Sequence, residues 1–310
     1  MSILRLVKWT VVAAEAKVRH SRLGPWIAAV AYRIWHQIWD SFFEIRAGFV
    51  GYAATVKIVG HPFLFDMRDR SVARILYLFR EYENNELMLL ARQLREGMTF
   101  MDIGANSGVY TLIAAELVGL TGKVFAFEPC PTNMNILETN LALNGLTNVI
   151  AQQRAITDRI GQVELYLSNI NPGDHRIQNG RDDDIYNAGR KRTKIIVDAT
   201  SVDEYLRSRG LRIDVVKMDI QGAEAIALHG MRETLAENEE ILLITEFWPY
   251  GLERFGSSPS QFIRDIEGSG FTLYEARGDG TPSVIRASEL ESKRADDRHI
   301  TLFCSKHRLN

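Results

Sequence analysis

The sequence has only two cysteines, Cys130 and Cys304, and they lie far apart in the chain. Neither belongs to a CxxC pair or to a Cys/His cluster, so the sequence contains no recognisable zinc site or disulfide framework. A chain with so few cysteines is typical of a reducing compartment, and we expect a cytoplasmic protein.

The sequence also has no long apolar run and no excess of charge of one sign. It contains no 18 consecutive apolar residues, so we expect no helix that spans a membrane. The formal net charge of -2 gives no basic surface for a nucleic acid, and we expect no nucleic-acid partner. With 310 residues, 46% hydrophobic and 25% charged, the composition is that of a globular protein with a sizeable core and an appendage.

The appendage is predicted at the amino terminus, as a helical extension over residues 1–83. Its clearest segment, GPWIAAVAYRIWHQIWDSFFEIR, places Trp26, Trp35 and Trp39 on one side of an amphipathic helix. Such an aromatic face packs on the following domain or on a second copy of the chain in a homo-oligomer. The alternative is peripheral membrane contact through tryptophan and flanking arginine. We favour packing because apolar helical stripes usually belong to a core.

Residues 84–310 are predicted to form an α/β domain. Short apolar runs such as MTFMDIG, GKVFAFEP, IDVVKMDI and EILLITEFWP are separated by helical stretches. This alternation predicts a Rossmann-like, doubly wound and mostly parallel sheet with helices on both faces. Two further strands, GFTLYEARG and RHITLFCSK, lack a crossover helix between them and predict an antiparallel edge.

The segment FMDIGANSG, residues 100–108, ends one of these strands and is predicted to bind a ligand. Ligands of such sheets bind outside the carboxyl ends of the strands. Gly104 allows a left-handed turn or a close approach to a ligand, and Gly108 lets the next helix begin beside it. The following strand ends at Glu128, whose carboxylate can accept hydrogen bonds from both hydroxyls of a ribose. We therefore expect a ligand that contains an adenosine-like nucleoside.

The same segment distinguishes between two classes of nucleoside ligand. The dinucleotide fingerprint G-x-G-x-x-G has a middle glycine that lets pyrophosphate approach the backbone, but Asn106 stands there in this chain. Asp102 would also repel a pyrophosphate. A cationic ligand, S-adenosylmethionine, is favoured, and a nicotinamide-dependent oxidoreductase is the alternative.

Five motifs in order, FMDIGANSGVYT, FAFEPCPTNMNILETNLALNG, RAITDRIGQVELYL, VVKMDIQGAEAIALHGM and ILLITEFWP, resemble those of FkbM-type S-adenosylmethionine-dependent methyltransferases. The resemblance covers residues 84–275. It implies the class I methyltransferase fold and transfer of a methyl group to oxygen, commonly a hydroxyl of a sugar, polyketide or other secondary metabolite. The chain departs from the family pattern at Gln221, where the family usually has glutamate.

The resemblance also implies which residues bind the cofactor. Glu128 would take the ribose, and Pro129 would shape the turn after it. Asn133 and Ala155 would lie near the ribose and adenine edges. The methionine side would be bound by the loop residues Asp102, Gly104, Ala105, Asn106, Gly108, Tyr110 and Thr111. For Tyr110 and Thr111 the alternative is packing and capping of the helix start, and Asp102 could equally hold neighbouring backbone.

A hydroxyl acceptor needs a base or a metal, because a neutral alcohol is a poor nucleophile. Asp219 and Glu246 end two strands and are the candidate catalytic acids, able to hold a hydroxyl or to chelate Mg2+. His175, in the polar loop NPGDHRIQNG, is the candidate base. The alternatives are helix caps for the two acids and a solvated loop for the histidine. Glu224 opens the next helix, where the helix dipole favours an acid, and is interpreted as structural.

The sequence thus predicts an O-methyltransferase that acts on a small molecule, a sugar, or a glycan or lipid precursor. The alternative from another class is a catalytically degenerate nucleoside-binding protein, which Gln221 alone suggests. The presence of Asp219, Glu246 and the whole 100–108 segment argues against that alternative.

Overall fold

The computed structural model describes residues 41–42, 53–58, 60–67, 73, 76–77, 83–168, 172–177, 192–207, 209–293 and 299–310. By their internal contacts the residues divide into two units, Met1–Tyr82 and Glu83–Asn310. Apart from Ser41 and Phe42, the predicted aromatic helix lies outside the described residues. Its packing, oligomer and membrane alternatives therefore stay predictions.

The first unit contains an antiparallel strand pair that the predicted helical extension over residues 1–83 did not include. Strands β1, Ala53–Ile58, and β2, His61–Asp66, pair from Ala53↔Asp66 to Ile58↔His61. In β1 the buried side chains alternate with exposed ones, which is the period of a half-buried strand. This period-two signal was present in the sequence.

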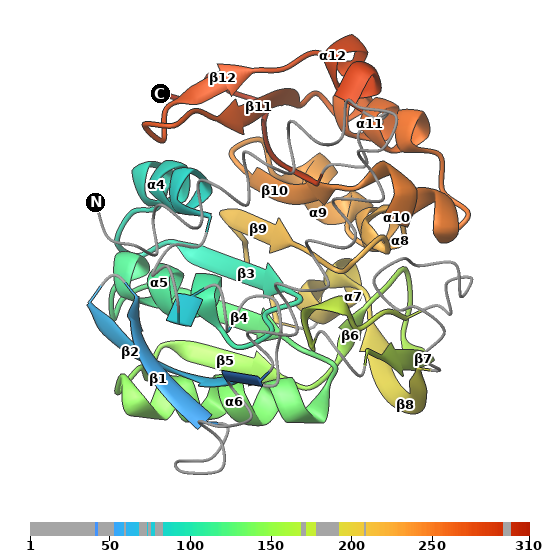
Figure 1. Ribbon diagram of the computed structural model, residues 1–310. Helices are drawn as coiled ribbons and strands as arrows, with labels where there is room; N and C mark the ends of the chain where they lie inside the picture. Colours follow the sequence, from blue (N-terminus) through green and yellow to red (C-terminus); the bar gives the residue numbers. More distant parts are fainter. Residues whose placement is uncertain are drawn as a thin grey trace. The chain divides into compact units, whose positions relative to one another are not determined.

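The second unit is built on an eight-stranded sheet with the order β12-β11-β13-β10-β9-β3-β4-β5 (Figure 1). The strands from β10 to β5 in this order all pair in parallel. The bounds of the eight strands are β3 Thr99–Ile103, β4 Lys123–Phe127, β5 Val149–Gln152, β9 Val215–Met218, β10 Leu242–Phe247, β11 Thr272–Ala276, β12 Pro282–Val284 and β13 Ile300–Ser305.

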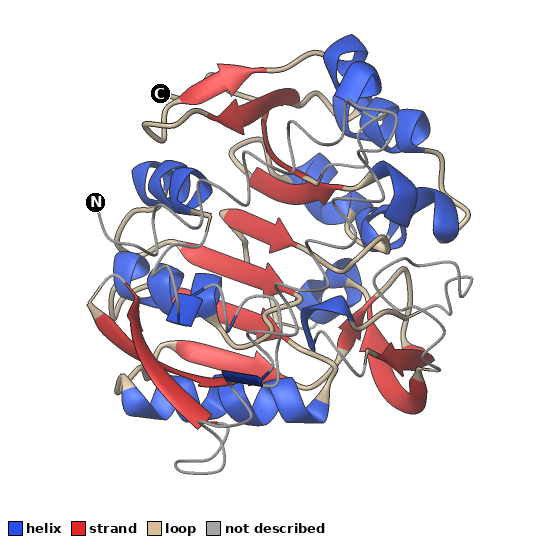
Figure 2. Cartoon of the chain, viewed as in Figure 1, coloured by secondary structure: helices blue, strands red, loops and turns tan. Residues whose placement is uncertain are grey.

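Helices flank this sheet, as Figure 2 shows. Their bounds are α4 Asn84–Gln93, α5 Val109–Val118, α6 Pro131–Leu143, α7 Val202–Arg207, α8 Glu224–His229, α9 Arg232–Glu237, α10 Pro249–Arg254, α11 Pro259–Gly268 and α12 Ala287–Lys293. The local sequence explains where several of these helices begin. For example, Ser258 caps α11 by accepting a hydrogen bond from the Gln261 N–H, and Pro259 occupies the first helical position.

The two faces of the sheet carry different side chains. Met101, Ile103 and Met218 belong to a large apolar cluster with residues of α7, α8, α9, α10 and α11. Because strand side chains alternate, Asp102 and Lys217 point to the opposite face, where α5 packs on β3 and β4. The predicted α/β class, a doubly wound Rossmann-like sheet, is confirmed.

The antiparallel part of the sheet differs in detail from the expected edge. Strand β13 pairs antiparallel with both β10 and β11, so the strand that comes last in the sequence lies inside the sheet. The edge itself is β12, antiparallel to β11. Strand β13 can occupy this place because its last four residues are buried, as a strand covered on both faces requires.

A second, three-stranded sheet lies between β5 and β9 in the sequence and was not predicted as a separate sheet. Its order is β6-β8-β7, with β6 Ala155–Ile156, β7 Gly161–Leu167 and β8 Thr193–Thr200. A short 3-10 helix, Pro172–Asp174, follows β7. Among the helices that the structure describes, none has the length and apolar character needed to cross a membrane.

The close approach of β3 to β9 gives a first testable prediction. Gly104 has a φ of 81°, and a Cβ placed on it would lie 2.1 Å from the Asp219 carbonyl oxygen. Gly145 also has a positive φ, 62°, but open space around it. We expect Gly145→Ala to lower the free energy of unfolding by about 1 kcal/mol, the cost of a left-handed alanine. Gly104→Ala should lower it by about 3 kcal/mol or more, because backbone must also move.

Urea unfolding followed by circular dichroism measures both changes against the unsubstituted protein. Equal losses for the two variants would contradict the steric role of Gly104, since strain from positive φ is common to both.

Candidate active site

The loop between β3 and α5 is held in an unusual backbone shape. Gly104, Asn106 and Gly108 have φ values of 81°, 52° and 96°, so three left-handed residues occur within five. The N–H groups of Gly104 and Ala105 both donate to the Phe127 carbonyl, each at 2.9 Å. Since Phe127 ends β4, the loop is fixed to the neighbouring strand, and the predicted role of both glycines in shaping it agrees with the geometry.

Glu128, directly after β4, joins this loop to the start of α6. Its Oε2 accepts a hydrogen bond from the Asn106 N–H at 2.8 Å, and its Oε1 accepts one from the Cys130 N–H at 2.9 Å. Only 4% of the residue is exposed, and this burial raises the pKa of Glu128 to about 7, although both hydrogen bonds oppose the rise. Each carboxylate oxygen can accept further hydrogen bonds, which the two hydroxyls of a ribose would supply.

Asp102 lies beneath the loop and is fully buried. Its Oδ2 accepts a hydrogen bond from Thr111 Oγ1 at 2.6 Å, and its Oδ1 lies 3.5 Å from Lys217 Nζ. Burial alone would lower the pKa of Lys217, but the charges of Asp102 and Asp219 raise it above its usual range. Asp102 thus holds the start of α5 and a buried lysine, in keeping with the alternative that it acts on neighbouring protein groups.

The remaining predicted cofactor residues also make contacts within the protein. Tyr110 donates from its hydroxyl to Glu83 Oε2 at 2.5 Å, and Lys217 Nζ lies 4.8 Å from its ring centre. Asn133 donates from Nδ2 to the Pro172 carbonyl at 3.1 Å.

Pro129 and Ala155 lie on different elements of the structure. Pro129 lies in the loop between β4 and α6, and Ala155 is in β6, where it packs with buried Cys130. For Tyr110, Thr111, Asn133 and Ala155 the contacts favour packing and positioning, and their contact with a cofactor stays a prediction.

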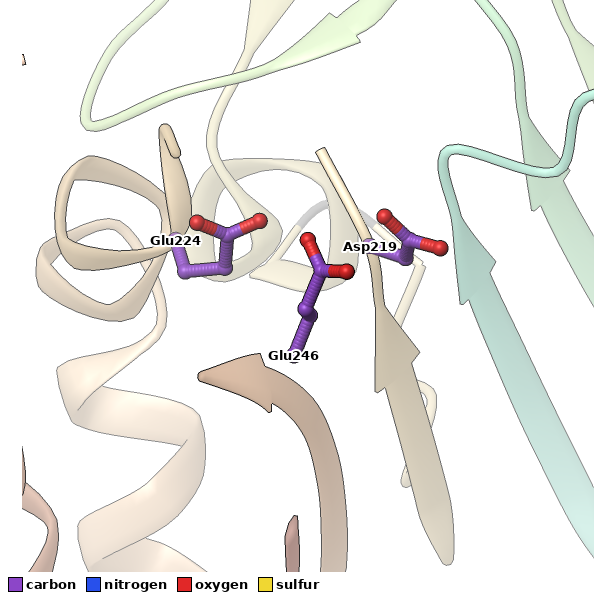
Figure 3. Close-up of side chains that lie close together, drawn as sticks. All are labelled: Asp219, Glu224 and Glu246. Carbon is purple, nitrogen blue, oxygen red and sulfur yellow. The ribbon is translucent and has the colours of Figure 1, made fainter. Parts of the chain in front are cut away.

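The two predicted catalytic acids come together at the carboxyl ends of β9 and β10 (Figure 3). Gln221 lies between them: its Nε2 donates to Asp219 Oδ1 at 2.9 Å and lies 3.5 Å from Glu246 Oε2. The Asp219 N–H donates to the Ile103 carbonyl at 3.1 Å, so this acid is directly beside the β3–α5 loop. Gln221, where the family pattern has glutamate, therefore supports both acids with a neutral amide.

Glu224 joins these acids from the first turn of α8 and is fully buried. One oxygen from each of Asp219, Glu224 and Glu246 lies within 4.8 Å of the others. Burial first, and then the negative charge of Glu246, raises the pKa of Glu224 well above its ordinary value. Burial and the charge of Asp219 raise the pKa of Glu246 in the same way. Glu224 is thus part of the acid cluster as well as of the helix start.

His299 is a functional candidate that the sequence reasoning missed. Its Nδ1 lies 2.6 Å from Glu246 Oε1, and its ring stacks on Trp248 with the centres 4.7 Å apart. Arg176 places its guanidinium 4.9 Å from the Trp248 ring centre. The pairing of β13 with β10, which sets Ile300 against Phe247, brings His299 to Glu246. Only this strand pairing, which is not visible in the sequence, reveals the contact.

His175 has an environment that disfavours its predicted role as the base. Its Nδ1 accepts a hydrogen bond from the Ser168 N–H at 3.0 Å. Burial and the nearby Arg192 charge lower the pKa of His175 to about 4. An imidazole with one nitrogen already occupied and so low a pKa is a weak proton acceptor at neutral pH.

Comparisons with known proteins agree with this geometry. Residues 102–273, more than half of the chain, match the family described as the methyltransferase FkbM domain. The methyltransferase sdnD of Sordaria araneosa is 31% identical over 222 residues, which cover 63% of this chain and 81% of that protein. A protein-L-isoaspartate O-methyltransferase of Methanococcoides burtonii is 39% identical over 57 residues, 18% of this chain and 28% of that protein.

Among solved structures, an FkbM methyltransferase from Methylobacillus flagellatus KT is 14% identical, with a TM-score of 0.42, and the match covers 67% of this chain and 43% of that one. The family match over the β3–α5 loop, Glu128 and both strand-end acids, together with the relative from Sordaria araneosa, shows that the chain belongs to the FkbM family of S-adenosylmethionine-dependent methyltransferases.

Proposed function

We propose that the protein is an O-methyltransferase that methylates a hydroxyl of a small molecule, a sugar, or a glycan or lipid precursor. The observation that carries this proposal is the group formed by Asp219, Glu246 and His299 beside the β3–α5 loop. Carboxylates and an imidazole at this edge can accept a hydrogen bond from a hydroxyl and take up its proton.

The residues around Glu128, at the carboxyl end of β4, fit S-adenosylmethionine. Both Glu128 oxygens retain accepting capacity after their bonds to the Asn106 and Cys130 N–H groups, so they suit the two hydroxyls of a ribose. When bound, this cofactor supplies a methyl group on a sulfonium that leaves as a neutral thioether. The protein must then align the acceptor, a contribution that can be worth about 7 to 11 kcal/mol of the barrier.

We assign the acceptor's proton to the pair formed by Glu246 and His299. Glu246 orients the imidazole through one oxygen, an arrangement of base and orienting group that recurs in enzymes that activate weak nucleophiles. The stacking of His299 on Trp248 limits rotation of its ring. Asp219, held by Gln221 and next to Lys217, is left to position the hydroxyl.

The two alternatives have less support. Membership of a methyltransferase family argues against a nicotinamide-dependent oxidoreductase. A degenerate binding protein was suggested by Gln221, but this side chain holds Asp219 by a hydrogen bond and leaves the acids in place.

Cofactor choice is the first test of the proposal. Calorimetry should show tighter binding of S-adenosylhomocysteine than of NAD. Glu128→Ala should weaken S-adenosylhomocysteine binding by about 1 to 3 kcal/mol, because ribose hydroxyls would lose their acceptors. Glu138→Ala, at an exposed position of α6, is the control and should change nothing. Tighter binding of NAD would refute the assignment of the cofactor.

The pH dependence of this binding follows from the raised pKa of Glu128, about 7. Ribose hydroxyls donate to the ionised carboxylate, and below its folded-state pKa the group is protonated. Affinity for S-adenosylhomocysteine should therefore be full above pH 7 and fall as pH decreases, approaching about tenfold per pH unit. Titration calorimetry from pH 5.5 to 8.5 measures this slope. In Glu128→Gln the affinity should be lower but flat with pH, and a slope retained in that variant would assign it to another group.

Turnover should depend on the acid and imidazole set rather than on His175. Asp219→Asn and His299→Ala should each lower turnover by about 100-fold, the usual scale of acid–base contributions, with little change in cofactor affinity. His175→Ala should stay within a few fold of the unsubstituted enzyme. Transfer of tritiated methyl to acceptors found in a screen of sugars and hydroxylated lipids provides the measurement. If His175→Ala lowered turnover as much as His299→Ala does, the role of the base would be assigned to His175 instead.

A further inference from the structure

The acid cluster of Asp219, Glu224 and Glu246 has a geometry that its hydrogen bonds do not explain. The three residues come from the end of β9, the first turn of α8 and the end of β10, and their carboxylates converge on one small region (Figure 3). One oxygen of each lies within 4.8 Å of the others. Like charges at such distances repel, and desolvation makes the repulsion stronger.

An independent observation concerns the second oxygen of Glu224. The residue is fully buried, and its Oε1 accepts a hydrogen bond from the Ile220 N–H at 2.9 Å. Its Oε2 has no hydrogen-bond partner among the residues that the structure describes. Buried carboxylate oxygens nearly always have a donor or a cation, since leaving one unpaired is costly. The structure thus contains a buried, unpartnered oxygen within the cluster.

Lys217 and His299 lie beside the acid cluster. Lys217 Nζ lies 3.9 Å from Asp219 Oδ2, but it is shared with Asp102, and His299 contacts the Oε1 of Glu246. Among the residues that the structure describes, no cationic side chain forms an ion pair with Glu224. A divalent cation would supply positive charge at this place.

We propose that Asp219, Glu224 and Glu246 bind one divalent cation at the carboxyl ends of β9 and β10. Carboxylate oxygens are the ligands that Mg2+, Mn2+ and Ca2+ prefer. The separation of up to 4.8 Å between the oxygens suits ligands on different sides of one such ion, at bond lengths of about 2.0 to 2.6 Å. His299 contacts Glu246 from outside the three ligands, so the carboxylate can still orient its imidazole.

Gln221 lies close enough to Asp219 and Glu246 to act as a further ligand of the cation. Its amide nitrogen faces Asp219, and a rotation of the amide by half a turn exchanges the nitrogen and the oxygen. With a cation present, the flipped side chain turns its oxygen toward the ion. The inference shares its residues with the proposed acceptor side, but it requires neither an acceptor nor methyl transfer.

The experiment measures cation binding to the full-length protein without cofactor or acceptor. After treatment with EDTA and dialysis, bound Mn2+ is counted by electron paramagnetic resonance, and Mg2+ and Ca2+ are tested by competition. We expect one Mn2+ per chain that Mg2+ or Ca2+ displaces. Glu224→Gln should weaken Mn2+ binding at least tenfold, whereas Glu267→Gln, at an exposed position of α11, should bind as the unsubstituted protein does.

Thermal unfolding separates loss of a ligand from loss of the fold. In cation-free buffer, Glu224→Gln should unfold at the same or a higher temperature, because the amide keeps an oxygen for the Ile220 N–H and removes one acid from a crowded cluster. Added Mn2+ should raise the unfolding temperature of the unsubstituted protein and much less that of the variant.

Absence of stoichiometric Mn2+, or equal Mn2+ binding by Glu224→Gln and the unsubstituted protein, would overturn the inference. Either result would leave the proposed function intact if S-adenosylhomocysteine binds and methyl transfer proceeds in EDTA. Conversely, Mn2+ binding that depends on Glu224 would stand even if no hydroxyl acceptor were found.

Discussion

The buried ion pair between Lys217 and Asp102 is the contact on which the rest of the site depends. The two residues are direct partners on adjacent parallel strands, so their side chains leave the same face of the sheet. Removing one partner would leave an uncompensated charge in the interior, a change that typically costs about 3 to 5 kcal/mol. Through Thr111 the pair also holds the start of α5, and Lys217 lies beside Asp219 of the acid cluster as well. One buried lysine thus connects the start of the β3–α5 loop with Asp219 at the end of β9.

The acids beyond this pair are kept close against their mutual repulsion by the backbone. Asp219 is fixed by the bond of its N–H to Ile103, and Glu224 by the bond of its carboxylate to the Ile220 N–H. Gln221, at a φ of 57°, turns its amide between Asp219 and Glu246. A glutamate at this position would add a further negative charge, so the amide gives the same reach with less repulsion.

Much of the fold could be predicted from the sequence, because strand runs and helical stretches alternate from residue 98 onward with clear periods. The position of Glu128, Asp219 and Glu246 at strand ends was also predicted, since polar residues at strand ends of a parallel sheet gather at one edge. The contact of His299 with Glu246 could not be found, because it depends on β13 entering between β10 and β11. The internal role of Asp102 was left open for a related reason: the sequence does not show that Lys217 lies opposite it.

The position of β13 has a consequence for how the protein folds as it is synthesised. Until residues 300–305 are available, β10 and β11 lack the strand that joins them, and each has an unpaired edge exposed to other chains. Glu246 also lacks its imidazole partner during this time, since His299 directly precedes β13. A chain still on the ribosome can therefore assemble the parallel half of the sheet early. The contact between His299 and Glu246 forms only after β13 has been released. Chaperone protection of the β10 and β11 edges would matter most in that interval.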